Sequence, residues 1–257
     1  MLTKAKIENE LRLLGIEPPR IIFYDSTDST NTRAVEYART PFKHDKTTPT
    51  VFIANGQSAG RGRRGRSFVS RRGTGIYLSL LTHPDNRGAE VTKCTAYAAV
   101  ALCRAIESLC DCHIGIKWVN DLYIGDKKLA GILTETEMTD NGKMSYLVVG
   151  MGINVYKEAI SDEISDIATS LEHHTSTLPD RSKLAAAIIR ELLYPEEGLF
   201  EEYRKRSIAI GRDVTVVKLS EQYNAKVIDL DRDFSLIVER ENGRQEKLFT
   251  GEISLKI

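Results

Sequence analysis

The stretch QSAGRGRRGR, residues 57–66, decides how the rest of this sequence is interpreted. It lies in a segment, residues 55–75, with six arginines and no acidic residue between Arg61 and Arg72. A loop of this length inside a compact domain is usually functional. Glycines let backbone N–H groups approach a ligand, and arginines supply planar forks for phosphate or carboxylate. The composition favours an anionic ligand covered by the loop, but a nucleic-acid-binding patch or a solvated basic loop is an equal alternative at this point.

The segments on either side of this loop predict a mixed α/β body. Short apolar runs bounded by turn residues indicate strands, and apolar residues at helical spacing indicate helices. Ser29-Thr30-Asn31 can cap the helix after the first strand, because small polar side chains bind free backbone N–H groups. The expected strands are 21–24, 51–54, 76–81, 114–118, 121–124, 128–136 and 146–155, and the expected helices are 31–38, 91–109 and 181–206, the last of which Pro195 can interrupt.

From Gly211 the pattern changes to short β runs, namely VTVVKL, AKVIDL, FSLIVE and KLFTGEI. Asn242-Gly243 adds the signal of a tight turn between two of them. A run of β structure after a mixed α/β body predicts a small barrel-like C-terminal domain, with the boundary near residues 207–211.

Composition excludes several classes of protein. The chain has 257 residues, with 36 Lys plus Arg against 36 Asp plus Glu, so its net charge is zero. A chain without basic excess has no overall attraction to nucleic acid or anionic membrane. No apolar run approaches the roughly 18 residues of a membrane span. The first 15 residues indicate an amphipathic helix with Ile7, Leu11 and Leu14 on one face rather than a secretion signal.

The four cysteines do not suggest a metal site. Cys94, Cys103 and Cys110 lie in an apolar helical pattern, so small buried side chains are the simplest interpretation. Cys110-Asp111-Cys112 is not a zinc spacing by itself, and the chain has only five histidines. We therefore reject a zinc site and expect a reducing, cytoplasmic location.

Two further strings carry residues suited to a nucleotide. In Lys117-Trp118-Val119-Asn120-Asp121 the aromatic ring can flank a base while the polar groups hold phosphates and a metal; a buried Trp118 beside surface charges is the alternative. Lys128 begins the otherwise apolar run LAGIL, and a lysine entering a buried strand needs an anionic partner or a site to face.

A third string places two glycines inside an apolar strand, in VVGMGINV, residues 148–155. Glycine weakens a strand, so Gly150 and Gly152 indicate close approach of a ligand or another backbone, or else a bulge. The string lacks the third glycine and the following helix of a dinucleotide-binding fingerprint. No Walker A string occurs anywhere in the chain.

Taken together, these strings resemble the biotin protein ligase family. The resemblance spans residues 21–257 in the family's order, and six strings in sequence make it strong. The matching strings are Asp28-Ser29-Thr30-Asn31; Gln57 with Gly60-Arg61-Gly62-Arg63-Arg64-Gly65; Lys117-Trp118-x-Asn120-Asp121; Lys128-Leu129-Ala130-Gly131-Ile132-Leu133; Gly150-x-Gly152-Ile153-Asn154; and Gly251-Glu252-Ile253-Ser254-Leu255.

The resemblance implies an α+β fold with two domains. Residues 1–208 would form the biotin- and ATP-binding domain on a mixed sheet of the class II synthetase type, and residues 209–257 an SH3-like β-barrel. Two features depart from the family's pattern. Val119 stands where the family commonly has proline, and only about 20 residues precede the first matching strand, too few for the helix-turn-helix of the regulatory members.

The resemblance also assigns roles to residues. Ser29, Thr30 and Gln57 would bind the ureido head of biotin, and Arg61, Arg63 and Lys128 would meet the biotin carboxylate and the α-phosphate of ATP. Asn120 and Asp121 would serve the nucleotide and Mg²⁺ end, with Lys117 nearby. The expected catalytic residues are Lys128, Arg63 and Lys117; the expected biotin site adds Gly60 and Gly131; the expected adenylate site adds Arg66, Trp118, Gly152 and Asn154; and Asp121 is the expected Mg²⁺ ligand.

The activity implied is that of a biotin–[acetyl-CoA-carboxylase] ligase. Biotin and ATP would give biotinyl-5′-AMP and pyrophosphate, and the biotinyl group would pass to a lysine of a biotin carboxyl carrier protein. The expected partners include no DNA and no membrane, and the sequence leaves monomer or homodimer open. A lipoate–protein ligase or lipoyl/octanoyl transferase is the nearest alternative, and a nucleic-acid-binding protein using the Arg/Gly loop is the second.

Overall fold

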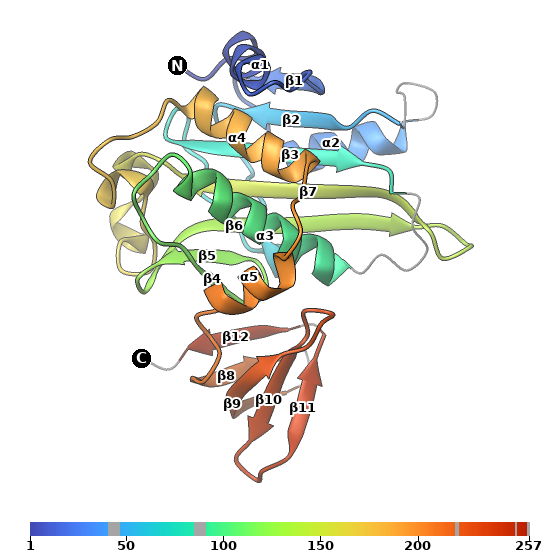
Figure 1. The fold of residues 1–257 in the computed structure, drawn as a ribbon, viewed down its shortest axis with the longest axis vertical. Helices are drawn as coiled ribbons and strands as arrows, with labels where there is room; N and C mark the ends of the chain where they lie inside the picture. Colours follow the sequence, from blue (N-terminus) through green and yellow to red (C-terminus); the bar gives the residue numbers. More distant parts are fainter. Residues whose placement is uncertain (41–46, 85–90, 219–220, 250, 256–257) are drawn as a thin grey trace.

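The computed structural model describes residues 1–40, 47–84, 91–218, 221–249 and 251–255. Its body is built on a seven-stranded mixed sheet in the order β1-β2-β3-β7-β6-β5-β4 (Figure 1). Only β1 and β2 pair in parallel, and every other neighbouring pair is antiparallel. The strands are β1 (Arg20–Tyr24), β2 (Thr50–Ala54), β3 (Gly75–Thr82), β4 (Gly115–Lys117), β5 (Asp121–Ile124), β6 (Lys127–Met138) and β7 (Met144–Asn154).

Helices cover the two faces of this sheet unequally. On one face α1 (Lys4–Leu13), α3 (Val91–Glu107) and α4 (Arg181–Leu193) enclose the main core, with Leu78 and Ile153 among its buried residues. On the other face α2 (Thr30–Arg39) lies over β2, β3 and β7 and encloses a small cluster with Phe52 and Val148. The long helix α3 places ten buried residues toward the core, which explains its apolar composition.

The C-terminal strands form a separate antiparallel sheet in the order β11-β10-β9-β8-β12. The linker after α5 (Leu199–Arg206) adds to the edge of β4, where the N–H of Ile208 donates to the carbonyl of Ile116 at 3.0 Å. The sheet lies directly below α5 in Figure 1. Its strands are β8 (Asp213–Val217), β9 (Gln222–Leu230), β10 (Leu236–Arg240), β11 (Gln245–Leu248) and β12 (Glu252–Leu255).

An aromatic cluster joins this sheet to the body. Phe234 comes from the turn between β9 and β10. Its ring meets those of Tyr97, Phe200 and Tyr203 edge-on, with distances of 5.3–5.4 Å between ring centroids. The indole N–H of Trp118 donates to the backbone carbonyl of Phe234 at 2.8 Å. This hydrogen bond links the turn directly to the Lys117–Asp121 segment.

The sequence predicted the α+β class and the C-terminal β structure correctly, and the differences are local. The expected helix 181–206 is divided into α4 and α5 around Pro195, an interruption that the sequence allowed, because proline lacks the N–H that a helix interior needs. Ser29 stands at the N-cap of α2, but its side chain makes no capping hydrogen bond. Leu14 is 46% exposed, whereas Ile7 and Leu11 are fully buried. Among the described residues, no helix has both the length and the apolar character needed to cross a membrane.

Candidate active site

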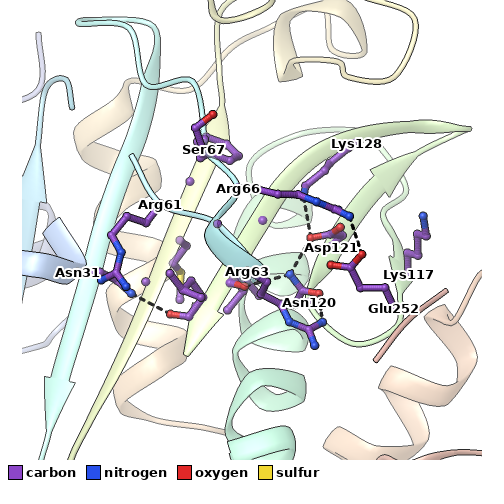
Figure 2. Close-up of a pocket in the computed structure, with 18 of the residues that line it drawn as sticks. Asn31, Arg61, Arg63, Arg66, Ser67, Lys117, Asn120, Asp121, Lys128 and Glu252 are labelled. Atoms are coloured by element: carbon purple, nitrogen blue, oxygen red, sulfur yellow. Dashed lines mark hydrogen bonds and ion pairs between the residues drawn. The ribbon is translucent and has the colours of Figure 1, made fainter. Parts of the chain in front are cut away.

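One elongated pocket gathers most of the residues singled out from the sequence. It lies where the start of α2, the Arg/Gly loop and strands β4 to β7 meet β12 of the C-terminal sheet. Figure 2 shows Asn31 and Arg61 at one end, and Lys117, Asp121, Lys128 and Glu252 at the other. The lining residues are Ser29, Thr30, Asn31, Gln57, Arg61, Gly62, Arg63, Arg66, Ser67, Phe68, Lys117, Trp118, Asn120, Asp121, Lys128, Gly131, Ile132, Leu133, Gly150, Met151, Gly152, Glu252, Ile253 and Ser254.

The end of the pocket around Thr30 is held by neutral hydrogen bonds. The backbone N–H of Thr30 donates to Oε1 of Gln57 at 2.8 Å, and the Thr30 hydroxyl lies 3.1 Å from the same oxygen. The Nε2 group of Gln57 donates to the hydroxyl of Ser70 at 2.9 Å. These bonds attach the start of α2 to the Arg/Gly loop and fix the orientation of the Gln57 amide.

Asn31 occupies the floor of this end. Its Nδ2 group donates to the carbonyl of Leu133 at 3.1 Å and to the carboxylate of Glu135 at 2.9 Å. Gly150 lies beneath it: a Cβ atom there would come 1.7 Å from Oδ1 of Asn31, so only glycine leaves room. A side chain at Gly152 would likewise meet the ring of Phe68 at 2.5 Å. The two strand glycines therefore accommodate side chains of the site, without a bulge in the pairing of β7 with β3.

The other end of the pocket gathers charges. Nζ of Lys128 lies 2.7 Å from Oδ1 of Asp121, and Nδ2 of Asn120 donates to the same oxygen at 2.8 Å. Lys117 points to the same end in Figure 2. Burial lowers the pKa of the Lys117 ammonium, against the opposing effect of Asp121. Because burial removes water from the Lys117 ammonium, an anionic ligand that replaces this water is bound favourably.

The Arg/Gly loop reaches the charged end through Arg63. Its guanidinium donates to Oδ1 of Asn120 at 2.9 Å and to the carbonyl of Gly251 at 3.1 Å. Burial lowers the pKa of Arg63, which nevertheless stays charged near neutral pH, as arginine does in proteins. Arg66 pairs with Glu252 at 2.7 Å. The loop is thus connected both to the Asn120 turn and to the start of β12.

Most predicted site residues come together in this pocket, and two do not line it. Gly60 lies in the neck of the loop, where its carbonyl accepts from the N–H of Phe68 at 2.9 Å. Asn154, expected in the adenylate site, is 5% exposed at the end of β7, and its amide donates to the carbonyl of Thr169 at 3.1 Å.

Trp118 lines the pocket, but it is a core residue rather than an open platform for a base. It is 3% exposed, and its N–H is occupied by Phe234. The sequence had left these two interpretations open, and the structure favours the buried one. The peptide bond between Trp118 and Val119 is cis.

Several lining residues were not singled out from the sequence. Asn31 and Glu252 stand inside strings that we quoted, so their position beside assigned residues could have identified them. Nothing in the sequence marks Phe68 or Ser67 as part of the pocket, because their place depends on how the loop folds back. Arg61 was expected at the substrate carboxylate; it forms a two-point ion pair with Glu135 at 2.8 and 2.9 Å.

The carboxylates of the pocket suit a metal ion that is also bound by the phosphates of a nucleotide. Among the described residues, no group of three or more His, Cys, Asp or Glu side chains could hold an ion by itself. The acidic residues that line the pocket are Asp121 and Glu252. Mg²⁺ in nucleotide sites commonly takes one or two carboxylates together with phosphate oxygens and water, so these residues fit that form of binding.

Comparison with known proteins agrees with this geometry. The model of the Biotin/lipoate A/B protein ligase family matches residues 23–154. The bifunctional ligase/repressor BirA of Bacillus subtilis is 30% identical over 249 residues, which cover 91% of this chain and 74% of that protein. A biotin–[acetyl-CoA-carboxylase] ligase of Mycobacterium tuberculosis is 30% identical over 177 residues, or 65% of this chain and 64% of that protein.

A solved structure shows the same fold. The biotin protein ligase of Aquifex aeolicus in complex with biotin and ATP superposes with a TM-score of 0.76 and 25% identity, covering 92% of this chain and 98% of that chain. The family match extends over more than half of the chain, and the relatives add most of the remainder. This chain therefore belongs to the biotin/lipoate A/B protein ligase family.

Proposed function

We propose that this protein is a biotin protein ligase. It activates biotin with ATP to biotinyl-5′-AMP and transfers the biotinyl group to a lysine of a biotin carboxyl carrier protein. The observation that carries the proposal is one continuous pocket, with neutral hydrogen-bonding groups at one end and Arg63, Lys117 and Lys128 at the other. Biotin needs the first kind of surface for its ureido ring, and its activated carboxylate needs the second. Relatives named as biotin ligases support the same conclusion.

The biotin head would bind at the Thr30 end. Ser29, Thr30 and Gln57 supply hydroxyl and amide groups there, and they come from two segments that the hydrogen bonds of Gln57 hold together. The valeryl chain would run toward Gly131 on β6, where the absent side chain leaves space. This orientation brings the biotin carboxylate to Lys128 and Arg63.

The first reaction is a displacement at phosphorus. A carboxylate oxygen of biotin forms a bond to the α-phosphorus of ATP, and the bond between that phosphorus and the bridging oxygen breaks, releasing pyrophosphate. Lys128 and Arg63 stabilise the negative charge that develops on the α-phosphate oxygens, and Lys117 attracts the leaving phosphates. Removing one such donor typically costs about 10²–10³ in rate. Asn120 holds the Arg63 guanidinium in place.

Mg²⁺ would enter as a companion of the nucleotide. Asp121 would hold it, with Glu252 as the second carboxylate at this end. When bound, the ion neutralises phosphate charge. Asp121 already lies against Lys128, so the same carboxylate orients that lysine.

The second reaction uses the acceptor protein. The lysine amine of the carrier attacks the carboxyl carbon of the mixed anhydride, an amide bond forms, the carbon–oxygen bond to phosphate breaks, and AMP leaves. The amine proton passes to solvent. Because the anhydride reacts with water, a loop that covers it has a clear purpose. The Arg/Gly loop meets this need through its contacts with Asn120 and Gly251.

A direct test follows the products of both steps. The protein is incubated with biotin, ATP and MgCl₂, and pyrophosphate and biotinyl-5′-AMP are measured before a carrier domain is added and weighed by mass spectrometry. Release of pyrophosphate that depends on biotin, followed by a biotinyl mass increase on the carrier, is the expected result. Lipoate in place of biotin is the comparison, and activity with lipoate alone would establish the alternative.

The nucleic-acid alternative is disfavoured by the partners of the loop arginines. Arg61, Arg66 and Arg72 each lie within 2.8 Å of a carboxylate, on Glu135, Glu252 and Asp25 respectively. Arginines neutralised in this way do not form an open basic surface. The first helix, α1, buries Ile7 and Leu11 in the core and contacts α4, so it too belongs to the ligase body.

Two broader assignments accompany the proposal. Residues 1–208 form the catalytic domain, and residues 209–257 form a C-terminal domain that contributes Glu252, Ile253 and Ser254 to the pocket. The cysteines Cys94, Cys103, Cys110 and Cys112 are free thiols, which agrees with the reducing cytoplasm.

A further inference from the structure

Beneath the Thr30 end of the pocket lies a buried hydroxyl that neither the sequence strings nor the proposed reaction uses. Ser79 sits in the middle of β3, is 0% exposed and does not line the pocket. Its strand neighbour on β7 is Gly150, the glycine over which Asn31 lies. The Ser79 hydroxyl is 2.6 Å from Oδ1 of Asn31 and 2.8 Å from the hydroxyl of Thr30.

We propose that Ser79 is a positioning residue that sets the hydrogen-bond polarity of Thr30, so that this end of the pocket accepts a ligand N–H group. The proposal rests on the proposed biotin ligase function and adds a determinant of its specificity. It follows from counting protons in the network.

The first step is the orientation of Asn31. Its Nδ2 group faces the carbonyl of Leu133 and the carboxylate of Glu135, at 3.1 and 2.9 Å. Both of these groups only accept, since the two carboxylate oxygens of Glu135 each accept from the guanidinium of Arg61. The amide therefore cannot be flipped, and Oδ1, which only accepts, faces Ser79. The single proton of the Ser79 hydroxyl consequently goes to Asn31.

The second step concerns Thr30. With its proton given to Asn31, Ser79 can only accept from Thr30. The other neighbour of the Thr30 hydroxyl is Oε1 of Gln57 at 3.1 Å, which already accepts the backbone N–H of Thr30 and is likewise an acceptor. The one proton of Thr30 is therefore bound inside the protein, whichever of the two partners takes it. Only lone pairs of Thr30 remain for the pocket.

The third step is the consequence for the ligand. A group that meets Thr30 favourably must donate, as a ureido N–H does. The dithiolane ring of lipoate carries no donor and gains nothing from this acceptor. Replacing Ser79 by alanine removes one acceptor for the Thr30 proton and leaves the buried Oδ1 of Asn31 without its donor. The Thr30 proton then keeps only the longer, 3.1 Å contact with Oε1 of Gln57, an oxygen that also accepts the backbone N–H of Thr30. The hydroxyl can therefore turn its proton toward the ligand, against the ureido N–H, more readily than in the wild type.

The test measures biotin binding and steady-state kinetics of pyrophosphate release in wild type and Ser79→Ala. We expect the Kd and KM for biotin to rise about tenfold, because this is roughly the change in affinity that the loss of one hydrogen bond causes. We expect the KM for ATP, and kcat at saturating biotin, to stay within twofold. Ser108→Ala, the same change at the end of α3, is the matched control and should keep the wild-type affinity.

A second ligand separates positioning from a general disturbance of the pocket. The two biotin analogues in which one ureido N–H is replaced by oxygen each lack one donor. Ser79→Ala should weaken the binding of biotin but strengthen that of the analogue whose oxygen faces Thr30, because the Thr30 hydroxyl can then donate to that oxygen. Ser79→Cys, with a similar shape and a weak S–H donor, should bind biotin with an affinity between those of wild type and Ser79→Ala.

The outcomes distinguish this inference from the proposed function. A wild-type protein that does not bind biotin contradicts the proposed function. A wild type that binds biotin while Ser79→Ala binds it equally well overturns only the role of Ser79. Equal losses in biotin affinity, ATP affinity and kcat would also overturn it, because they would indicate a merely structural residue. If Ser79→Ala does not fold, the Ser79→Cys variant decides, and wild-type affinity there counts against the proposal.

Discussion

At the Thr30 end of the pocket, the groups proposed to bind the biotin head, Ser29, Thr30 and Gln57, are neutral, and the charges of Arg61 and Glu135 are paired with each other. At the Lys128 end, the groups proposed to act on the substrate are the cations Arg63, Lys117 and Lys128. The first end is built entirely from α2, the Arg/Gly loop and the strands of the large sheet. The second end also draws on the C-terminal sheet through Gly251 and Glu252. Preformed hydrogen bonds serve affinity and selectivity, while concentrated charge serves a transition state. Substitutions at the two ends should therefore separate binding from rate.

The largest effect is expected at Lys128. Lys128→Ala should lower the rate of biotin-dependent pyrophosphate release by about 10²–10³, because a cation at the developing charge is lost. The thermal midpoint should change little, and biotin affinity should fall by less than the rate, because the groups proposed to bind the ureido head at the Thr30 end remain in place. The matched control is Lys127→Ala, since that neighbouring ammonium is exposed and bonds only to the carbonyl of Ser165 among the described residues. Pyrophosphate release within tenfold of wild type for Lys128→Ala would contradict the assigned role.

Arg63 should give the next largest effect, on retention of the intermediate. Arg63→Gly removes the bonds from the loop to Asn120 and Gly251, so biotinyl-5′-AMP should escape and label lysines indiscriminately. We expect labelling of albumin relative to a carrier domain to rise by about tenfold or more, on the scale of two lost charge-assisted hydrogen bonds. Arg71→Gly, an exposed arginine on the same loop, is the control. Unchanged selectivity would argue against a retaining loop.

The contrast between the two ends also explains what the sequence could predict. The strings around Thr30, Gln57, Lys128 and Asp121 carry both residue type and spacing, and their assembly in one pocket was expected. The strand glycines were interpreted as space for a ligand or a backbone. The structure gives that space to Asn31 and Phe68, which depends on packing between segments more than 80 residues apart.

What the sequence did not show has the same origin. Asn154 was assigned to the adenylate site by its motif, and that assignment stays a prediction; in the structure its amide donates to the carbonyl of Thr169 at the end of β7, outside the residues that line the pocket. Ser79 carried no signal at all, since a serine in an apolar strand reveals its partners only after folding. The place of Glu252 in the pocket could not be predicted without knowing that the C-terminal sheet contacts the Arg/Gly loop. Long-range contacts of this kind are not encoded in local periodicity.

A smaller effect should come from the C-terminal side of the charged end. Glu252→Gln weakens the ion pair with Arg66 and should raise the KM for ATP about threefold, since an exposed pair contributes under about 1 kcal/mol. Biotin affinity should not change, because the hydrogen bonds described at the Thr30 end come from α2, the Arg/Gly loop and the large sheet. Glu239→Gln on β10 is the matched control. An equal loss of biotin affinity in Glu252→Gln would remove the distinction between the two ends.

The smallest effect should appear in the pH dependence of stability, through the turn that joins the C-terminal sheet to Trp118. Asp233 precedes Phe234 in this turn. Although burial alone would raise its pKa, hydrogen bonds from Lys247 and Ser235 lower the pKa of Asp233 to about 2. The carboxylate accepts from the N–H of Ser235 at 3.0 Å and lies 2.7 Å from Nζ of Lys247. These contacts hold the backbone conformation that presents Phe234 to the aromatic cluster.

The sign of the effect follows from the lowered pKa. The unfolded chain takes up the proton near the ordinary aspartate pKa of 3.8, while the folded chain resists until about pH 2. The stabilisation is therefore complete above pH 3.8 and is lost as the pH falls through this window. Asp233→Asn should lower the free energy of unfolding by about 1 kcal/mol at pH 7, the scale of a partly exposed pair with its hydrogen bonds. Urea unfolding of both proteins from pH 7 to pH 2 measures this difference, which should narrow toward zero at the acid end; a constant difference would show that Asp233 acts through its shape and not through its charge.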